Sequence, residues 1–305
     1  MITVWLPEAE SETLMGGLPD GFRADVWTGG PELPDSVDTV EVIVPPFDVA
    51  DAELARLAEL PRLKLVQLES VGVEWIRPFV PGGVTLCNAR GAYDAAVSEW
   101  IIGVSLAHLL RLPHFGQARR DERWDYGPTD SLEGKRVLVV GHGSIGAALS
   151  ARLAAFDVEV VGVARRAREG VHGIEELPKL LPEADIVVLL VPLTPTTAGL
   201  VDAAFLAGMR DGALLVNAAR GGLVDNDALL AELHGGRLRA ALDVTDPEPL
   251  PAGHPLWSAP GLLLTPHVAG SNGTPPAKAM ALAKAQLERY AAGRPLANVI
   301  DEDGY

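Results

Sequence analysis

Apolar and polar residues alternate along this chain in two successive series, each typical of strands separated by helices. The first series ends near residue 90, and amphipathic stretches such as 48–60 separate its apolar runs, which span residues 2–6, 39–46, 63–69 and 83–88. The second series has longer and uniformly apolar runs, at residues 135–141, 158–164, 184–192, 212–219, 238–244 and 261–267. Strands that alternate with helices predict parallel sheets covered by helices. Strands this apolar predict burial on both faces, as in a doubly wound sheet.

The segment that joins the two series, residues 95–124, predicts one long buried helix. Apolar residues lie on all its sides, Ser98 is a candidate N-cap, and Pro113 interrupts the pattern. A final helix is expected over residues 275–293. We therefore predict an α/β fold of two doubly wound parallel-sheet domains. They are a flavodoxin-like substrate domain, residues 1–97 and 269–305, and a Rossmann cofactor domain inserted in it, residues 98–268.

Composition and charge narrow the possible partners and compartments. The chain of 305 residues has 25 Lys and Arg against 41 Asp and Glu, and its net charge of −16 argues against nucleic acid or an anionic membrane as partner. The sequence has no apolar stretch long enough to predict a membrane span and no signal-peptide pattern at its start. The single cysteine, Cys87, lies in an apolar run and is expected in the core. Because one cysteine cannot form an internal disulfide, we expect a protein of the reducing cytoplasm. No metal site is predicted.

A glycine-rich motif follows the first strand of the second series. Gly141, Gly143 and Gly146 form G-x-G-x-x-G between an apolar run and a helical pattern. The first glycine permits a tight turn, the second lets a pyrophosphate approach the backbone, and the third permits close helix packing. The N–H groups of Ser144 and Ile145 would then face the phosphates from the helix N-terminus. The motif predicts a dinucleotide site.

The end of the next strand indicates which dinucleotide is bound. NAD-binding forms place an acidic residue there, about 20 residues after the glycines, to accept hydrogen bonds from the ribose. Here the position falls on Ala164, followed by Arg165 and Arg166. Guanidinium groups bind a 2′-phosphate that a carboxylate would repel, so we expect NADP(H) to be preferred over NAD(H). The alternative is that these arginines are merely solvated surface charges.

Candidate catalytic residues follow the later strands of the same series. Arg220 comes after the strand at 212–219, Asp243 and Glu248 lie at and after the end of the next strand, and His267 ends the last. Asp225 is a candidate cap of the helix after Arg220. Because ligands bind outside the carboxyl ends of strands in open parallel sheets, these side chains are expected to converge on one crevice.

Several segments resemble one known family. They are "ESVGVEW", "VSEWIIGVSLAHLLRLP", "GHGSIG", "VPLTPTT", "NAARGGLVDNDALL", "ALDVTDPEPLP" and "TPHVAG". Over most of its length the chain is similar to the D-isomer-specific 2-hydroxyacid dehydrogenases, and "DVTDPEPLPAGHPLW" is closest to the glyoxylate/hydroxypyruvate reductases. The resemblance implies NADPH-dependent reduction of a small 2-oxo acid to the D-2-hydroxy acid.

By position, the resemblance makes Arg220 the catalytic arginine, Glu248 the carboxylate and His267 the general acid/base, with Asp246 a nearby competitor of Glu248. The residue types suit these roles. The forked cation of Arg220 matches the oxygens of a 2-oxo acid. His267 can donate a proton to the developing alkoxide, and Glu248 at its far ring nitrogen would favour the imidazolium.

The resemblance also implies binding residues and an assembly. Backbone N–H groups of Val71 and Gly72 would hold the substrate carboxylate, Arg220 and His267 would also bind the substrate, and Asp243 would contact the nicotinamide amide. In this family the helices after the domain junction build a homodimer. Further residues match family positions that line the cofactor: Val191, Pro192, Thr197, Ala218, Ala219 and Gly270.

Two alternatives stay open. One is a dehydrogenase for another oxyanion such as phosphite, and the other is a cofactor-sensing, corepressor-like binding protein of the same fold. The sequence also departs from the family pattern at Val71, Glu74, Tyr93, Asp94 and Trp100. These departures lie in the substrate domain and its junction helix, so they leave the size of the substrate undetermined.

Overall fold

The computed structural model describes residues 1–47 and 49–300, and the chain divides into two compact units. Unit 1 comprises Met1–Tyr93 and Gly273–Tyr305, and unit 2 comprises Asp94–Asn272. The predicted domain limits, after residues 97 and 268, each differ from this division by four residues. Residues 301–305 of the predicted substrate domain lie outside the described residues.

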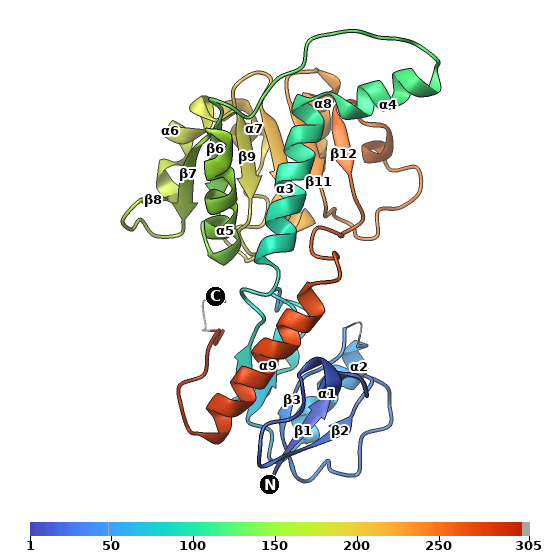
Figure 1. Ribbon diagram of the computed structural model, residues 1–305, viewed down its shortest axis with the longest axis vertical. Helices are drawn as coiled ribbons and strands as arrows, with labels where there is room; N and C mark the ends of the chain where they lie inside the picture. The colour runs from blue at the N-terminus through green and yellow to red at the C-terminus, as the bar shows by residue number, and fades with distance from the viewer. Residues whose placement is uncertain (48, 301–305) are drawn as a thin grey trace. The chain divides into compact units, whose positions relative to one another are not determined.

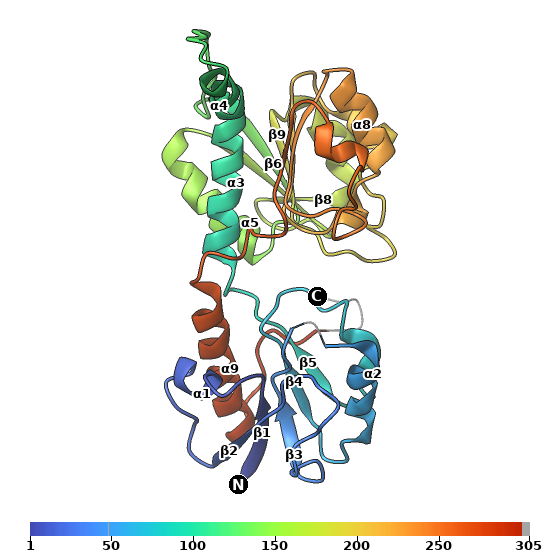
Figure 2. The ribbon, with the colours of Figure 1, turned by 90° about the vertical axis from the view of Figure 1, so that its right-hand side faces the viewer.

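Unit 1 is built on a five-stranded parallel sheet in the order β2-β1-β3-β4-β5. Helices α1 and α9 cover one face and α2 the other (Figure 2). Strand β2, at the edge of the sheet, was not predicted, because Arg23 and Asp25 leave it no continuous apolar run. The elements are β1 (Ile2–Leu6), α1 (Ser11–Leu14), β2 (Phe22–Val26), β3 (Val40–Ile43), α2 (Asp51–Leu54), β4 (Leu65–Gln67), β5 (Thr85–Cys87) and α9 (Pro275–Ala291).

The core of unit 1 lies on both sides of this sheet. Trp5 packs with α2 on one side, and Val4 packs with Met280 and Leu287 of α9 on the other. Cys87 is fully buried, as predicted, and burial raises the pKa of its thiol to about 11. Because all strands are parallel, the segments that follow them meet at one carboxyl edge of the sheet.

Unit 2 is built on a seven-stranded parallel sheet in the order β12-β11-β10-β9-β6-β7-β8. Helices α3 and α5 lie on one face and α8 on the other, so the doubly wound α/β prediction is confirmed (Figures 1 and 2). The short strand β8 was not predicted. The elements are β6 (Arg136–Val140), α5 (Ser144–Leu153), β7 (Glu159–Ala164), β8 (Val171–Gly173), α6 (Leu177–Leu180), β9 (Ile186–Leu189), α7 (Ala203–Gly208), β10 (Leu214–Asn217), α8 (Asn226–His234), β11 (Arg239–Leu242) and β12 (Leu262–Leu264).

The junction helix α3 (Asp94–Leu109) ends just before Pro113, which lies in the first turn of α4 (Leu112–Arg120). Ser98 is not an N-cap, and that prediction is wrong. The helix begins earlier, and the Ser98 hydroxyl donates to the Asp94 carbonyl one turn back. Proline is tolerated in a first turn because its missing N–H would have no helical partner there.

Within the described residues no single helix is long and apolar enough to cross a membrane. Helices α3 and α4, bent by 60° where they meet, reach that length and apolar composition only as a pair.

Candidate active site

The phosphate loop between β6 and α5 shows why glycine occupies each motif position. Gly141 has φ 106°, and a Cβ there would lie 2.4 Å from the carbonyl carbon of Leu190. A Cβ on Gly146 would lie 3.0 Å from the Gly141 carbonyl oxygen. At Gly143, directly before α5, a Cβ would meet nothing within 4 Å. The loop therefore leaves open space in front of a helix N-terminus, which fits a dinucleotide pyrophosphate.

Ser144, the first residue of α5, has a neighbour that the sequence did not reveal. Its hydroxyl donates to Oδ1 of Asp94 at 3.1 Å, which places a carboxylate beside this helix N-terminus. Because Asp94 lies 50 residues away in the chain, only the packing of α3 against α5 brings the two together.

The arginines follow β7 directly. Ala164 is the last residue of this strand, and Arg165 and Arg166 are exposed after it. Arg168 donates a hydrogen bond to the carbonyl oxygen of His142 in the phosphate loop. Arg168 belongs to the same run of arginines as Arg165 and Arg166, which is predicted to hold the 2′-phosphate. The structure thus joins the arginine segment to the glycine loop.

The other predicted cofactor positions lie on segments after β9, β10 and β12. Val191 and Pro192 follow β9, and the Thr197 hydroxyl donates to the Pro192 carbonyl at 2.6 Å. Ala218 and Ala219 follow β10, and Gly270 lies beyond β12. These segments share the carboxyl edge of the sheet with the phosphate loop, but their contacts with a cofactor stay a prediction.

His267 and Glu248 form a close pair. Nδ1 of His267 lies 2.6 Å from Oε1 of Glu248, and the two side chains are 51% and 40% exposed. Because an ionised carboxylate can only accept, Nδ1–H is the donor and the outer ring nitrogen Nε2 is left for a ligand. Asp246, the competitor, instead offers its backbone carbonyl to Nδ2 of Asn226. The geometry therefore pairs His267 with Glu248.

Asp243 holds the segment that carries His267. Its buried carboxylate accepts hydrogen bonds from the Thr265 hydroxyl at 2.5 Å and from the N–H groups of Val268 and Ala269 at 2.8 Å each. The N–H of His267 donates to the Asp243 carbonyl at 2.7 Å. His267 itself has φ 54°, a left-handed conformation uncommon outside glycine. Asp243 thus has a positioning role that the sequence analysis, which placed it on the nicotinamide amide, did not foresee.

Arg220 lies on the loop between β10 and α8. Its backbone carbonyl accepts from Nδ2 of Asn217, and its Nη1 donates to the Ala219 carbonyl at 2.6 Å. A Cβ on the next residue, Gly221, would lie 2.0 Å from the carbonyl oxygen of Thr245. The loop of Arg220 therefore touches the loop that leads from β11 to Glu248. The helix beyond begins at the predicted cap, because the Asp225 carboxylate accepts from two N–H groups of α8.

Val71 and Gly72 lie in unit 1, on the loop after β4 at the carboxyl edge of that sheet. One titratable residue beside them was missed. Burial, and to a smaller extent Glu8, raises the pKa of Glu69 to about 7. Nothing in the apolar pattern around Glu69 indicated this shift, because it depends on packing. In residues 1–47 and 49–300, no group of three or more His, Cys, Asp or Glu is arranged to hold a metal ion.

Comparison with known proteins identifies relatives of this chain. The family model described as "D-isomer specific 2-hydroxyacid dehydrogenase, NAD binding domain" matches residues 102–269. A glyoxylate reductase of Thermofilum pendens is 35% identical over 241 residues, covering 73% of this chain and 70% of that protein.

Two solved structures resemble the fold closely. A D-isomer specific 2-hydroxyacid dehydrogenase from Xanthobacter autotrophicus Py2, in complex with NADPH and MES, has a TM-score of 0.87 and 31% identity over 98% of both chains. An NADPH-dependent glyoxylate/hydroxypyruvate reductase from Sinorhizobium meliloti, in complex with NADP and sulfate, has a TM-score of 0.87 and 26% identity over 100% of both chains.

Proposed function

This chain belongs to the D-isomer-specific 2-hydroxyacid dehydrogenase family, and from that premise we propose that it reduces a small 2-oxo acid to the D-2-hydroxy acid with NADPH. The observation that carries the proposal is the 2.6 Å contact between His267 and Glu248, at the edge of a sheet whose glycine loop fits a dinucleotide. Homologues of this chain are NAD(P)-dependent D-2-hydroxyacid dehydrogenases or reductases.

The proposed chemistry divides between the cofactor and three side chains. When bound, the nicotinamide supplies the hydride that adds to the carbonyl carbon of the substrate. His267 gives the proton on Nε2 to the carbonyl oxygen, and it takes that proton back in the reverse direction. Glu248 accepts from Nδ1–H, fixes the ring orientation and stabilises the imidazolium before transfer. Arg220 supplies a permanent positive charge to the oxygens of the oxo acid.

The substrate carboxylate is assigned to the loop after β4. We assign it to the backbone N–H groups of Val71 and Gly72 on the family resemblance, and loop N–H groups are chemically suited to an anion.

NADP preference rests on the end of β7. The strand ends at Ala164 without an acidic side chain, and Arg165 and Arg166 are exposed where a 2′-phosphate would need cations. Arg168, bonded to the phosphate loop, adds a third guanidinium to the same segment. Charge-assisted hydrogen bonds of this kind contribute about 1.5–3 kcal/mol each.

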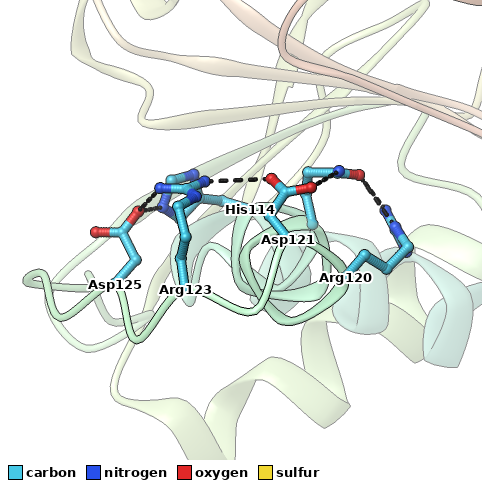
Figure 3. A network of polar contacts seen from close by, with 6 residues as sticks. His114, Arg120, Asp121, Arg123 and Asp125 are labelled. Carbon is cyan, nitrogen blue, oxygen red and sulfur yellow. Dashed lines mark hydrogen bonds and ion pairs between the residues drawn. The ribbon is translucent and has the colours of Figure 1, made fainter.

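The assembly we propose is a homodimer, formed through an arm that includes α4 and the segment up to Tyr126. In Figure 1 this arm extends away from the sheet of unit 2. Trp124 and Tyr126 are 97% and 91% exposed, which is unusual for large aromatic residues. The arm is also ordered by a chain of polar contacts, shown in Figure 3, that links His114, Gln117, Arg120, Asp121, Arg123 and Asp125.

We place the enzyme in the cytoplasm. Its single cysteine is buried, which suits a reducing compartment.

The test is nicotinamide oxidation by the purified protein, with NADPH and NADH in parallel, against glyoxylate, hydroxypyruvate, pyruvate and phenylpyruvate. We expect turnover with at least one oxo acid and a higher kcat/KM with NADPH. Arg165→Ala plus Arg166→Ala should lower kcat/KM for NADPH about tenfold or more and leave NADH within about twofold. The matched control, Arg62→Ala plus Arg294→Ala, removes two exposed arginines of unit 1 and should keep the preference. No nicotinamide oxidation with any pair of cofactor and oxo acid would reject the proposed reaction.

A further inference from the structure

Four consecutive carbonyl groups of the loop after β4 each accept a hydrogen bond from a different donor in unit 1. We call these donors the carbonyl clamp. In chain order the bonds are Tyr93 Oη to Glu69 O at 2.9 Å, Ala89 N to Ser70 O at 2.8 Å, Asn88 Nδ2 to Val71 O at 2.8 Å, and Ser70 Oγ to Gly72 O at 2.7 Å. The clamp therefore fixes the carbonyl side of four successive peptide groups.

Fixing a carbonyl also fixes the N–H of the following residue. In a trans peptide the C=O and the next N–H lie in one plane and point in opposite directions. The bond from Ala89 to Ser70 O thus sets the direction of the Val71 N–H, and the bond from Asn88 to Val71 O sets that of the Gly72 N–H. These are the two N–H groups to which the proposed function assigns the substrate carboxylate.

Asn88 is the side chain on which the second of these directions depends. It is 2% exposed, and its Oδ1 accepts from the backbone N–H of Arg90 at 3.1 Å. That bond assigns the other end of the amide, Nδ2, to the Val71 carbonyl. The Asn88 backbone is held as well, because its N–H donates to Asn298 O and its carbonyl accepts from Nε2 of Gln67. The amide is therefore held in place before any ligand arrives.

We propose that Asn88 is a positioning residue for substrate recognition, which orients the Gly72 N–H toward the carboxylate of the 2-oxo acid. This inference rests on the proposed function of the Val71–Gly72 loop. Asn88 acts through the Val71 carbonyl without touching the substrate. Preorganised N–H donors bind an anion better than mobile ones, because no ordering is needed when the anion binds.

The experiment compares Asn88→Asp and Asn88→Ala with the wild type. Aspartate keeps the acceptor for Arg90 N–H but replaces the donor to Val71 O by a repelling oxygen, and alanine removes both contacts without adding charge. The matched control for Asn88→Ala is Ser105→Ala. Ser105 is an equally buried polar residue of unit 2, 3% exposed, whose hydroxyl donates to the Ile101 carbonyl at 2.7 Å within α3. Each variant is assayed with the best 2-oxo acid and with its neutral methyl ester, and NADPH binding is titrated by fluorescence.

We expect both Asn88 variants to raise KM for the acid about tenfold or more, with kcat within about threefold and the Kd for NADPH unchanged. For the ester, which lacks the carboxylate, kcat/KM should stay within about twofold. Ser105→Ala should change neither KM for the acid nor kcat/KM for the ester. Tyr93→Phe, which frees only the peptide that orients the Ser70 N–H, should raise KM less than the Asn88 variants.

Two results would overturn the inference. One is an unchanged KM for the acid in an Asn88 variant that folds and binds NADPH. The other is an equal loss with acid and ester, which would indicate a general distortion of the loop. Failure of the proposed function looks different, because the wild-type protein would then reduce none of the oxo acids.

Discussion

His267 combines a left-handed backbone with a close carboxylate partner, and the two features have separate causes. Hydrogen bonds to Asp243 hold the backbone, and Glu248 holds the ring. A non-glycine residue in this region costs of order 1 kcal/mol or more and persists only where the surroundings fix it. The surroundings of His267 therefore fix both its backbone and its ring, which suits the general acid that we propose it to be.

Glu248→Gln tests the partner of His267. Glutamine keeps an oxygen acceptor for Nδ1–H but removes the charge that stabilises the imidazolium, so we expect kcat/KM to fall about 100-fold at neutral pH. The pH at which reduction loses half its rate should also move to lower values. Asp246→Asn is the matched control, and its rate should remain within about twofold of the wild type. A larger loss from Asp246→Asn than from Glu248→Gln would reverse the assignment of the carboxylate.

Glu69 makes the stability of the protein depend on pH. Burial, followed by the charge of Glu8, raises its pKa from 4.5 to about 7, so the folded protein binds this proton more tightly than the unfolded chain does. The resulting stabilisation is complete below pH 4.5 and is lost as the pH rises to about 7. Urea unfolding of Glu69→Gln should show the wild type losing stability relative to the variant across that window. Parallel curves would contradict this, and Glu10→Gln, at an exposed carboxylate, is the control.

Much of the candidate site could be predicted at this scale, because strand ends place residues at a common edge. Arg220, Glu248 and His267 follow three neighbouring strands. The contact between Glu248 and the ring of His267 is the one expected from the sequence. Contacts that cross the chain were not predictable. The bond from Ser144 to Asp94 and the burial of Glu69 depend on tertiary packing, which no local pattern encodes.

At the scale of elements, Gly221 allows two loops of the Rossmann sheet to touch. A Cβ at this position would lie 2.0 Å from the Thr245 carbonyl oxygen, and that backbone group cannot move aside as a flexible side chain would. Gly221→Ala should therefore displace the loop of Arg220, lower kcat/KM about tenfold or more and reduce Tm by several degrees. Gly82→Ala, in an exposed turn of unit 1 where a Cβ meets nothing within 4 Å, should leave both values intact or raise Tm slightly. Wild-type behaviour of Gly221→Ala would show that the loops can separate.

Elements with long apolar runs were predicted well, and those without were not. All six apolar runs of the second series contain strands of one sheet, and the final helix forms as α9. Strand β2 alternates apolar and polar residues over only five positions and β8 has three residues, so neither forms the continuous apolar run by which the other strands were predicted. The mistaken cap at Ser98 has a related cause: a serine inside a helix can satisfy its hydroxyl on the preceding turn, as Ser98 does on Asp94.

For the whole molecule, the proposed dimer gives the arm a function. Trp124 and Tyr126 are large, exposed and carried on a segment that polar contacts hold to α4. Trp124→Ala plus Tyr126→Ala should shift the protein from dimer to monomer in sedimentation velocity at micromolar concentration, because aromatic anchors dominate interfaces. Phe47→Ala, at an aromatic residue of unit 1 that is 54% exposed, should remain dimeric. A wild type that sediments as a monomer would refute the assembly itself.

The insertion of unit 2 into unit 1 has a consequence for the order in which the protein is made. Every residue of unit 2 leaves the ribosome before α9, while the sheet of unit 1 still lacks the helix that covers one of its faces. The inserted unit can thus fold during translation, whereas the first unit must wait, with Val4 and Leu6 uncovered, until Met280 and Leu287 arrive. Because the backbone N–H of Asn88 donates to the carbonyl of Asn298, near the end of the chain, the loop after β4 would be among the last parts of the nascent enzyme to reach its final form.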